Sequence, residues 1–355
     1  MKRLKSFAAL ALCLGLLLAL PGCGSVTSTE KQLFAMNSAV SIKAYGKSAE
    51  AGLESAASVI NSLGVALDPK RDGSTAYTIN NSQGQSIVVT GQVAEMLLIA
   101  QQVHALSGGD FDPTVYPLVK AWGFVDGLYR VPSEDEIESL VKNVDFSAAT
   151  LSAMTDTDSY LFTLPVGMEF SFASLGRGCA AMYAARAMQT LGVEAGIVSI
   201  GGNIQTLGDK PDGLPWIIAV QDPANPSAYA CTLNLSGSHA VSTSGGYQRY
   251  FTAPDGTVYQ HILDPKTGYP VQSDLTSVSV VTRGGFGGQG TRADAYSTAL
   301  YVMGEQAAVD FWRAQDMSFD MVLITRDGRV VYTPGLADCF NEKDGTAYVY
   351  QLLAA

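Results

Sequence analysis

Residues 107–124 read SGGDFDPTVYPLVKAWGF, and they follow a segment with helical periodicity. Two glycines and two aspartates stand near the start of the stretch, and a Trp-Gly-Phe triplet ends it. Glycine-rich loops let backbone N–H groups approach an anion, and aromatic rings offer a face to a flat ligand. The stretch is therefore either a ligand-binding loop or a loop that ends a helix and buries Trp122. Its residues alone leave both interpretations open.

A second dense stretch, HILDPKTGYP, occupies residues 261–270 between two β-rich runs. Its two prolines and Gly268 predict a tight loop, because proline fixes φ and glycine accepts conformations that other residues resist. A loop does not explain His261, one of only three histidines, which stands three residues before Asp264. Taken alone, this stretch is equally a turn or a site.

A third segment, GTRADAYST at residues 290–298, places Asp294, Ser297 and Thr298 at i, i+3 and i+4. In a helix these side chains share one face. A carboxylate beside hydroxyl groups suits a hard cation such as Mg²⁺, which prefers oxygen ligands. The alternative is an aspartate that caps a helix, with a solvated threonine behind it.

Helical and strand patterns follow one another around these segments without a strict β-α-β alternation, which predicts an α+β fold. Thr90 is a plausible N-cap, Gly108 a plausible helix stop, and Asp327-Gly328 a hairpin turn. Helices are predicted over residues 47–65, 90–109, 131–144, 176–192, 292–304 and 305–315, strands over 33–46, 195–203, 215–223, 229–245 and 247–264, a hairpin over 320–334, and a loop over 67–84.

The composition sets limits on the function. A chain of 355 residues with 47% apolar residues is long enough for a large core and two lobes. The formal net charge is -11, so the surface repels nucleic acid and no nucleic-acid partner is expected. An anionic ligand would need a local source of positive charge, such as a metal ion or a helix N-terminus. The widely spaced cysteines argue against a disulfide framework.

The N-terminus carries a targeting signal rather than part of the fold. The basic residues MKRLK precede an apolar run, and LPGC follows at residues 20–23. This ending resembles the lipobox of bacterial lipoproteins, although Pro21 stands where alanine or serine is commoner. The resemblance implies a signal peptide over residues 1–22, a lipid on Cys23, and a protein anchored to the extracytoplasmic side of the cell membrane. An ordinary secretory signal is the alternative. A polar tether is predicted over residues 23–32, with one domain over 33–355.

Six motifs in order resemble the FAD:protein FMN transferases, the ApbE family of flavin-transferring lipoproteins. The resemblance runs from about Phe34 to Gly335. Its motifs are FAMNS, SGGDFDPTVYPLVKAWGF, LGVEAGIVSIGGNIQTLG, AVSTSGGYQRYF, HILDPKTGYPV and ADAYSTALYVMG.

This resemblance implies an ApbE-like, T-fold-like α+β fold, with mixed sheets and helices in two lobes around a flavin cleft. It implies a Mg²⁺-dependent activity that esterifies the FMN half of FAD to a Thr or Ser hydroxyl of a partner flavoprotein and releases AMP. By the same resemblance, the acceptor belongs to an exported electron-transfer system. Phosphoryl transfer needs positioning and charge neutralisation more than covalent chemistry, and a divalent ion supplies much of that.

The resemblance also assigns roles to residues. His261 either orients or deprotonates the acceptor hydroxyl, and Asp264 fixes the loop. The implied metal ligands are Ser174, Asp294, Ser297 and Thr298, and the implied flavin or adenine contacts are Met36, Asp110, Phe111, Asp112, Ser171, Arg177 and Leu263.

Several positions depart from the family pattern. Ser171 replaces an aspartate expected beside the nucleotide, and Leu67 stands where a tyrosine often stacks on the ring. Smaller departures are Ser174 for glycine, Arg177 for lysine, Met182 for aspartate and Gly246 for aspartate. The departures keep two alternatives open, namely an FAD-binding lipoprotein without efficient transfer, and an FAD pyrophosphate hydrolase that releases FMN and AMP.

Overall fold

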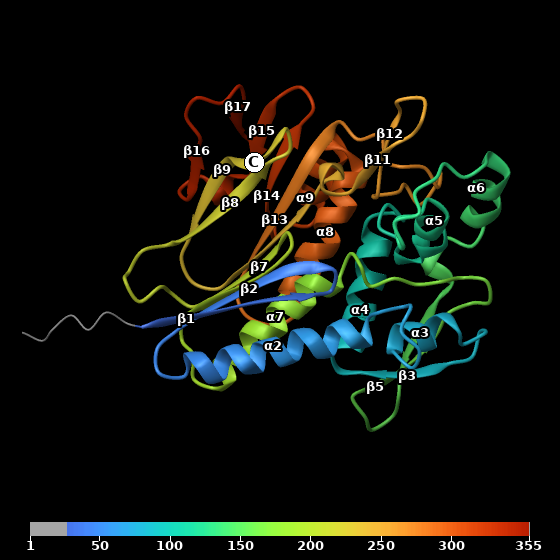
Figure 1. The fold of residues 1–355 in the computed structure, drawn as a ribbon, viewed down its shortest axis with the longest axis horizontal. Coiled ribbons are helices and arrows are strands. Elements are labelled where there is room, and N and C mark those ends of the chain that lie inside the picture. Colours follow the sequence, from blue (N-terminus) through green and yellow to red (C-terminus); the bar gives the residue numbers. More distant parts are fainter. Residues whose placement is uncertain (1–26, 355) are drawn as a thin grey trace, which may run out of the picture.

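The computed structural model describes residues 27–354. A nine-stranded sheet runs through the larger part of it (Figure 1). The predicted signal peptide and Cys23 lie outside these residues. Neighbouring strands are antiparallel, except for the last pair, which is parallel. In spatial order the strands are β1 (Ser28–Ala35), β2 (Ser38–Tyr45), β6 (Gly196–Ile200), β7 (Asn203–Leu207), β10 (His239–Ser244), β13 (Leu275–Arg283), β14 (Asp320–Thr325), β15 (Arg329–Tyr332) and β17 (Val349–Leu352).

Both faces of this sheet are covered, which explains why every residue of β14 is buried. Met321 and Leu323 point to a layer of helices, and Val322 and Ile324 point to a small second sheet. The helices are α2 (Ala49–Ala66), α7 (Gly176–Thr190), α8 (Gln289–Met303) and α9 (Glu305–Ala314), and the second sheet contains β8 (Trp216–Asp222), β9 (Asn225–Leu235) and β16 (Phe340–Glu342).

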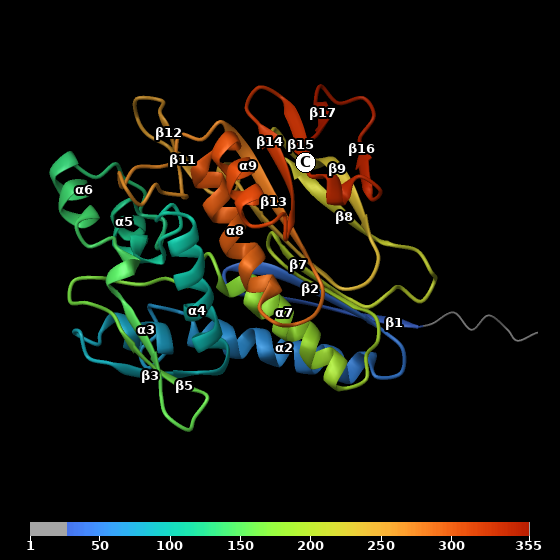
Figure 2. The same cartoon turned by 180° about the vertical axis from the view of Figure 1, so that it is seen from behind.

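A second group of elements lies beside α7 and α8, at the left in the view from behind (Figure 2). Helix α4 connects it to the first group by packing on α7 and α8. Its members are α3 (Thr75–Asn80), α4 (Gly91–Leu106), α5 (Tyr116–Ala121), α6 (Glu134–Val141), the three-stranded sheet of β3 (Ile87–Thr90), β5 (Ser159–Thr163) and β4 (Thr150–Ala153), and the ribbon of β11 (Tyr250–Thr252) and β12 (Val258–Gln260).

This architecture confirms the α+β prediction and most of the predicted helices. Helix α6 is capped as expected, because the Ser133 hydroxyl accepts a hydrogen bond from the backbone N–H of Glu136. The predicted hairpin is β14 and β15, and Gly328 adopts a positive φ of 85° at its turn. In the part of the chain that the structure describes, no helix is both long and apolar enough to cross a membrane.

Three predictions about local structure were wrong. Residues 33–46 form two strands rather than one, because Met36 and Asn37 both adopt a positive φ and reverse the chain. Strand β1 begins at Ser28 and therefore takes up part of the segment predicted to be a tether. The predicted loop 67–84 contains α3, whose N-cap Ser74 accepts a hydrogen bond from Tyr77.

Helices α7 and α8 cross at two glycines, Gly178 and Gly290. A Cβ atom on Gly178 would lie 2.1 Å from the carbonyl oxygen of Gly290, and a Cβ atom on Gly290 would lie 2.5 Å from that of Gly178. Only glycine leaves the two backbones this close. The contact places the first turn of α7 directly against α8.

We expect Gly178→Ala to lower the free energy of unfolding by about 2 kcal/mol, since over-packing an interior typically costs about 1–3 kcal/mol. The loss outweighs the better helix propensity of alanine. Urea unfolding of parent and variant measures it. Gly285→Ala is the control, because a Cβ atom there meets no atom within 4 Å. Equal unfolding midpoints for Gly178→Ala and the parent would contradict this account of the crossing.

Candidate active site

Asp294 is the centre of a buried cluster of oxygen atoms at the helix crossing. Its side chain is on α8 and is 3% exposed. One carboxylate oxygen accepts a hydrogen bond of 2.9 Å from the backbone N–H of Gly178, in the first turn of α7. The other lies 3.3 Å from the hydroxyl of Ser242 on β10. The free N–H groups of a helix N-terminus favour a negative charge there.

Two opposing effects act on this carboxylate. Burial raises the pKa of Asp294, because a charge in a dry interior loses its hydration. The nearby Arg177 guanidinium, the N–H of Gly178 and the side chains of Asn203 and Ser242 lower it in part. A cation next to the carboxylate would favour the charged form further.

Ser297 and Thr298 lie in the same cluster, as the spacing predicted. The Ser297 hydroxyl lies 2.8 Å from that of Ser244 on β10, and the Thr298 hydroxyl lies 3.2 Å from the same atom. Ser242 also donates to the amide oxygen of Asn203 on β7. The side chains around Asp294 thus present carboxylate, hydroxyl and amide oxygens, which are the donors that hard cations take.

No other acidic, histidine or cysteine side chain completes a group of three with Asp294 within residues 27–354. A cation here would therefore depend on neutral oxygens, water and its ligand for the remaining contacts. Ser174 precedes α7 by two residues and is partly buried. Its role as a further metal ligand stays a prediction.

His261 is placed by a single carbonyl group. The carbonyl oxygen of Arg249 accepts hydrogen bonds from both the backbone N–H and Nδ1 of His261, each 3.1 Å long. Because a carbonyl only accepts, Nδ1 carries the proton and Nε2 keeps a free lone pair in the neutral ring. The site lowers the pKa of His261 to about 3. Burial is the largest cause, and the positive charges of Arg249 and Arg177 add to it. The ring is therefore neutral near pH 7, and its Nε2 carries no proton.

Arg177 connects the histidine with the oxygen cluster. Its charge acts on the pKa values of His261 and of Asp294. It lies against the loop of Gly201, where a φ of 59° favours glycine. A Cβ atom on Gly201 would be 3.8 Å from the Nη1 of Arg177. The Nε atom is buried with no hydrogen-bond acceptor in the described chain. It is therefore available to an anionic ligand.

The loop of residues 261–270 is both a turn and part of this site. Asp264 fixes it, because its carboxylate accepts the N–H of Lys266 and its carbonyl accepts the N–H of Gly268. The indole N–H of Trp122 donates to the carbonyl of Gly268 over 2.9 Å. Residues 107–124 and the 261–270 loop are therefore in direct contact, and the Trp-Gly-Phe segment supports the loop that carries His261.

The predicted nucleotide contacts at residues 110–112 have partners within the protein. Asp112 is 7% exposed, and its carboxylate accepts the N–H groups of Thr114 and Phe146. Phe111 is buried in the main core, and Asp110 pairs with Lys266. The pair of Asp110 with Lys266 joins this segment to the 261–270 loop. Whether the three residues also touch a nucleotide stays a prediction.

The predicted contacts Ser171, Leu263 and Met36 lie in three different places. Ser171 lies beside residues 110–112, because its backbone N–H donates to the carbonyl of Pro113. Leu263 is buried with Trp122 in a small cluster. Met36 and Leu67 both lie against Gly176 at the start of α7, since a Cβ atom there would be 3.3 Å from the Met36 Cε and 2.9 Å from a Leu67 methyl.

Asn203, Ser242, Ser244 and Arg249 belong to the site but were missed. Small polar residues inside strands carry no pattern of their own, and Arg249 acts through its backbone carbonyl. Asn203 ends the segment VSIGGN, in which two glycines follow a strand. That position was the one signal available.

The sequence profile described as the ApbE family matches residues 36–323. The chain belongs to the ApbE family. The FAD:protein FMN transferase of Escherichia coli (strain K12) is 30% identical over 266 residues, which is 74% of this chain and 73% of that protein. The FAD:protein FMN transferase of Treponema pallidum is 28% identical, over 81% of each chain.

Solved ApbE structures are also similar to this one. The ApbE protein of Thermotoga maritima superimposes with a TM-score of 0.79 and 26% identity, over 90% of this chain and all of that one. The flavinyl transferase ApbE of Pseudomonas stutzeri gives a TM-score of 0.71 and 28% identity, over 85% and 92%. These similarities confirm the family assignment and the ApbE-like fold.

We expect the His261 ring to remain neutral, protonated at Nδ1, down to at least about pH 5. A free histidine is half protonated near pH 6.5, whereas the site lowers the pKa of His261 to about 3. NMR titration of the imidazole nitrogens measures this, and only three histidines need to be assigned. His261→Gln identifies the signal. A midpoint near 6.5, or a proton at Nε2, would contradict the described geometry.

Proposed function

We propose that this chain transfers the FMN half of FAD to a Ser or Thr hydroxyl of a partner protein. The observation that carries the proposal is the neutral His261, with Nε2 unprotonated, in the field of Arg177, whose charge also acts on Asp294. The Nε2 atom of His261 can accept the proton of an acceptor hydroxyl, and the Arg177 guanidinium can bind a phosphate oxygen. The oxygen atoms around Asp294 can bind a metal ion. FAD:protein FMN transferase is the activity after which the relatives are named.

In the proposed reaction the acceptor hydroxyl gives its proton to Nε2 of His261 as its oxygen bonds to the FMN phosphorus. The bond from that phosphorus to the bridging oxygen of the pyrophosphate breaks, and AMP leaves with the bridging oxygen. The Arg249 carbonyl keeps the imidazole in the required tautomer, and Arg177 offers its free Nε to a phosphate oxygen.

Asp294, Ser297 and Thr298 would hold a Mg²⁺ ion, with Ser174 as a further ligand. When bound, the ion neutralises pyrophosphate charge and makes AMP a better leaving group. Because the protein is strongly acidic, it needs a bound cation to hold a polyanion such as the pyrophosphate. The protein's own part is to keep Asp294 ionised, through the N–H of Gly178 and the charge of Arg177.

Ser171 keeps a second candidate open, an FAD-binding protein or FAD hydrolase without efficient transfer. Its hydroxyl accepts the N–H of Ala173 in its own loop, so it is already used locally. A test incubates the protein with FAD, Mg²⁺ and a purified flavoprotein that exposes a Thr or Ser residue. Mass spectrometry of the denatured acceptor would show covalent FMN together with free AMP. Free FMN and AMP without a modified acceptor would indicate hydrolysis, and unchanged FAD would indicate binding alone.

Asp294→Asn should reduce Mg²⁺-dependent turnover by at least about 100-fold, because it removes the charged ligand and leaves the shape of the side chain. Mg²⁺ requires near-ideal oxygen coordination. Asp310→Asn, which changes an exposed aspartate on α9, is the matched control. Calorimetric titration of Mg²⁺ into the FAD-bound protein is the second measurement, and an unchanged affinity in Asp294→Asn would remove this residue from the metal site.

We further propose that the mature protein is anchored by a lipid on Cys23, with its acceptor in an exported electron-transfer system. The basic and apolar residues that end in LPGC support this. Cys23→Ala should release the protein from the membrane fraction or leave its precursor uncleaved. If the variant fractionates and matures like the parent, Cys23 is not the anchor.

A further inference from the structure

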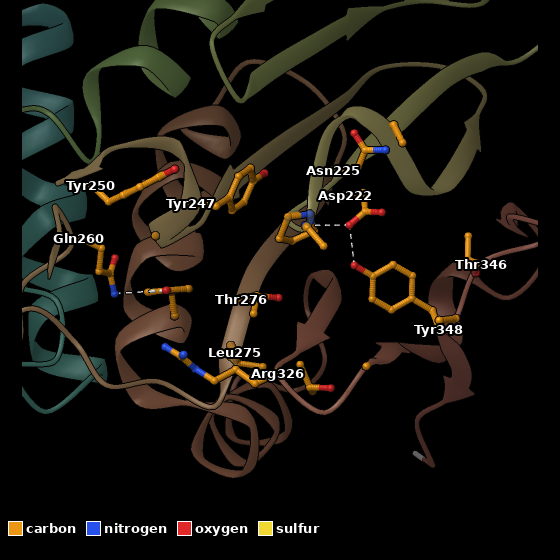
Figure 3. Close-up of a pocket in the computed structure, with 18 of the residues that line it drawn as sticks. Asp222, Asn225, Tyr247, Tyr250, Gln260, Leu275, Thr276, Arg326, Thr346 and Tyr348 are labelled. Atoms are coloured by element: carbon orange, nitrogen blue, oxygen red, sulfur yellow. Dashed lines mark hydrogen bonds between the residues drawn. The ribbon is translucent and has the colours of Figure 1, made fainter. Parts of the chain in front are cut away.

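A cavity of about 930 Å³ opens beside the site, and none of the site residues assigned from the sequence lines it. Figure 3 shows Tyr250 and Gln260 on one side of it, Asp222 and Tyr348 on the other, and Arg326 between them. The volume is within the range of pockets that bind ligands. The β11–β12 ribbon, the start of β13 and the C-terminal segment around residues 343–348 form its walls.

Three segments of the chain run from the site to the cavity. Ser244 of the oxygen cluster is followed two residues later by Gly246, which lines the cavity. On α8, Thr298 belongs to the cluster and Tyr301, one turn later, lines the cavity. On β12, Gln260 lines the cavity and directly precedes His261, so their Cα atoms are about 3.8 Å apart.

The β11–β12 ribbon separates the cavity from the cluster that supports His261. Tyr250 and Val258 face the cavity, and they are 54% and 56% exposed. Phe251 and Tyr259 face the opposite way and pack on the indole of Trp122. The His261 ring packs against Phe124 on that second side, and its backbone directly follows Gln260 of the cavity. A protein whose hydroxyl reaches His261 would therefore pass the edge of the ribbon that exposes Tyr250 and Val258. Exposed tyrosines are residues that protein interfaces favour.

The cavity is locally positive on an acidic protein. Arg326 and Lys343 line it, and Asp222, the one carboxylate among its lining residues, already accepts the hydroxyl of Tyr348 over 2.6 Å. Gln260 lies in the floor, where its amide N–H groups donate to the carbonyl of Val271 and the hydroxyl of Tyr301. Its amide oxygen is buried with no donor in the described chain.

Gly246 maintains the space beside Gln260. A Cβ atom at Gly246 would lie 2.6 Å from the Gln260 amide oxygen and 2.7 Å from the Tyr301 hydroxyl. Any side chain would displace these groups from the floor. The hollow next to His261 therefore depends on a glycine at this position.

We propose that this cavity docks an acidic segment of the acceptor protein, close to the hydroxyl that receives FMN. This rests on the proposed function. Arg326 and Lys343 attract a carboxylate of the segment, and an apolar side chain of the segment packs between Tyr250 and Val258. The cavity thus selects which protein presents its hydroxyl to Nε2 of His261, while FAD binds on the far side of the ribbon.

The test measures transfer kinetics with the acceptor protein that gains FMN in the assay above. Val258→Asp places a negative charge at the cavity wall, and Lys343→Gln removes a positive one. Each should raise the KM for the acceptor by about tenfold and leave the Kd for FAD unchanged. Ile217→Asp is the matched control, because Ile217 is 69% exposed on β8, outside the cavity. It should behave like the parent.

A photo-crosslinking amino acid at position 258 gives a second measurement that does not depend on turnover. It should crosslink the acceptor and a synthetic peptide that spans the modified residue, and the same group at position 217 should not. An unchanged acceptor KM in both variants, with a parent that transfers FMN, would overturn the docking site alone. A raised Kd for FAD would assign the cavity to the nucleotide and also overturn it. No transfer by the parent would reject the proposed function itself.

Discussion

A buried carboxylate at the crossing of two helices is the constraint on which the site depends. Asp294 is almost completely buried, and a charge there is tolerated only with partners close by. The N–H of Gly178 is one such partner, and it reaches Asp294 because Gly178 and Gly290 let the helices touch. The packing of α7 on α8 and the chemistry of the oxygen cluster therefore both require glycine at positions 178 and 290. A larger residue at either glycine would strain the fold and also move the donor away from the carboxylate.

Periodicity and capping residues predicted most of the helices and the hairpin at Gly328, because those signals are local. The turn between β1 and β2 could not be predicted in the same way. Met36 and Asn37 adopt left-handed conformations without a glycine, and the alternation of apolar residues continues through them. Helix α3 is short and is flanked by residues typical of loops, and the N-cap Ser74 is the one sequence feature that indicates it. Both errors come from short elements whose conformation is decided by tertiary packing.

The candidate site was predictable where its residues share one helix. Asp294, Ser297 and Thr298 are spaced so that a helix alone brings them together. Ser242 and Asn203 join them through strand pairing between β10 and β7, which no local pattern reveals. Asp112 shows that a motif can also suggest too much. Its position suggests ligand binding, but its carboxylate holds its own loop through buried hydrogen bonds.

The hydrogen bond between the Trp122 indole and the Gly268 carbonyl has a spectroscopic consequence. Trp122 is completely buried, and Phe251 and Tyr259 surround it on the ribbon that precedes His261. The other two tryptophans, Trp216 and Trp312, lie in the separate cores of the sheet and helix layers. Indole emission shifts to longer wavelength as water approaches the ring, so a protein that keeps Trp122 and replaces the other two with phenylalanine would carry its own reporter of the loop. Its emission would follow how often the loop that carries His261 opens to solvent.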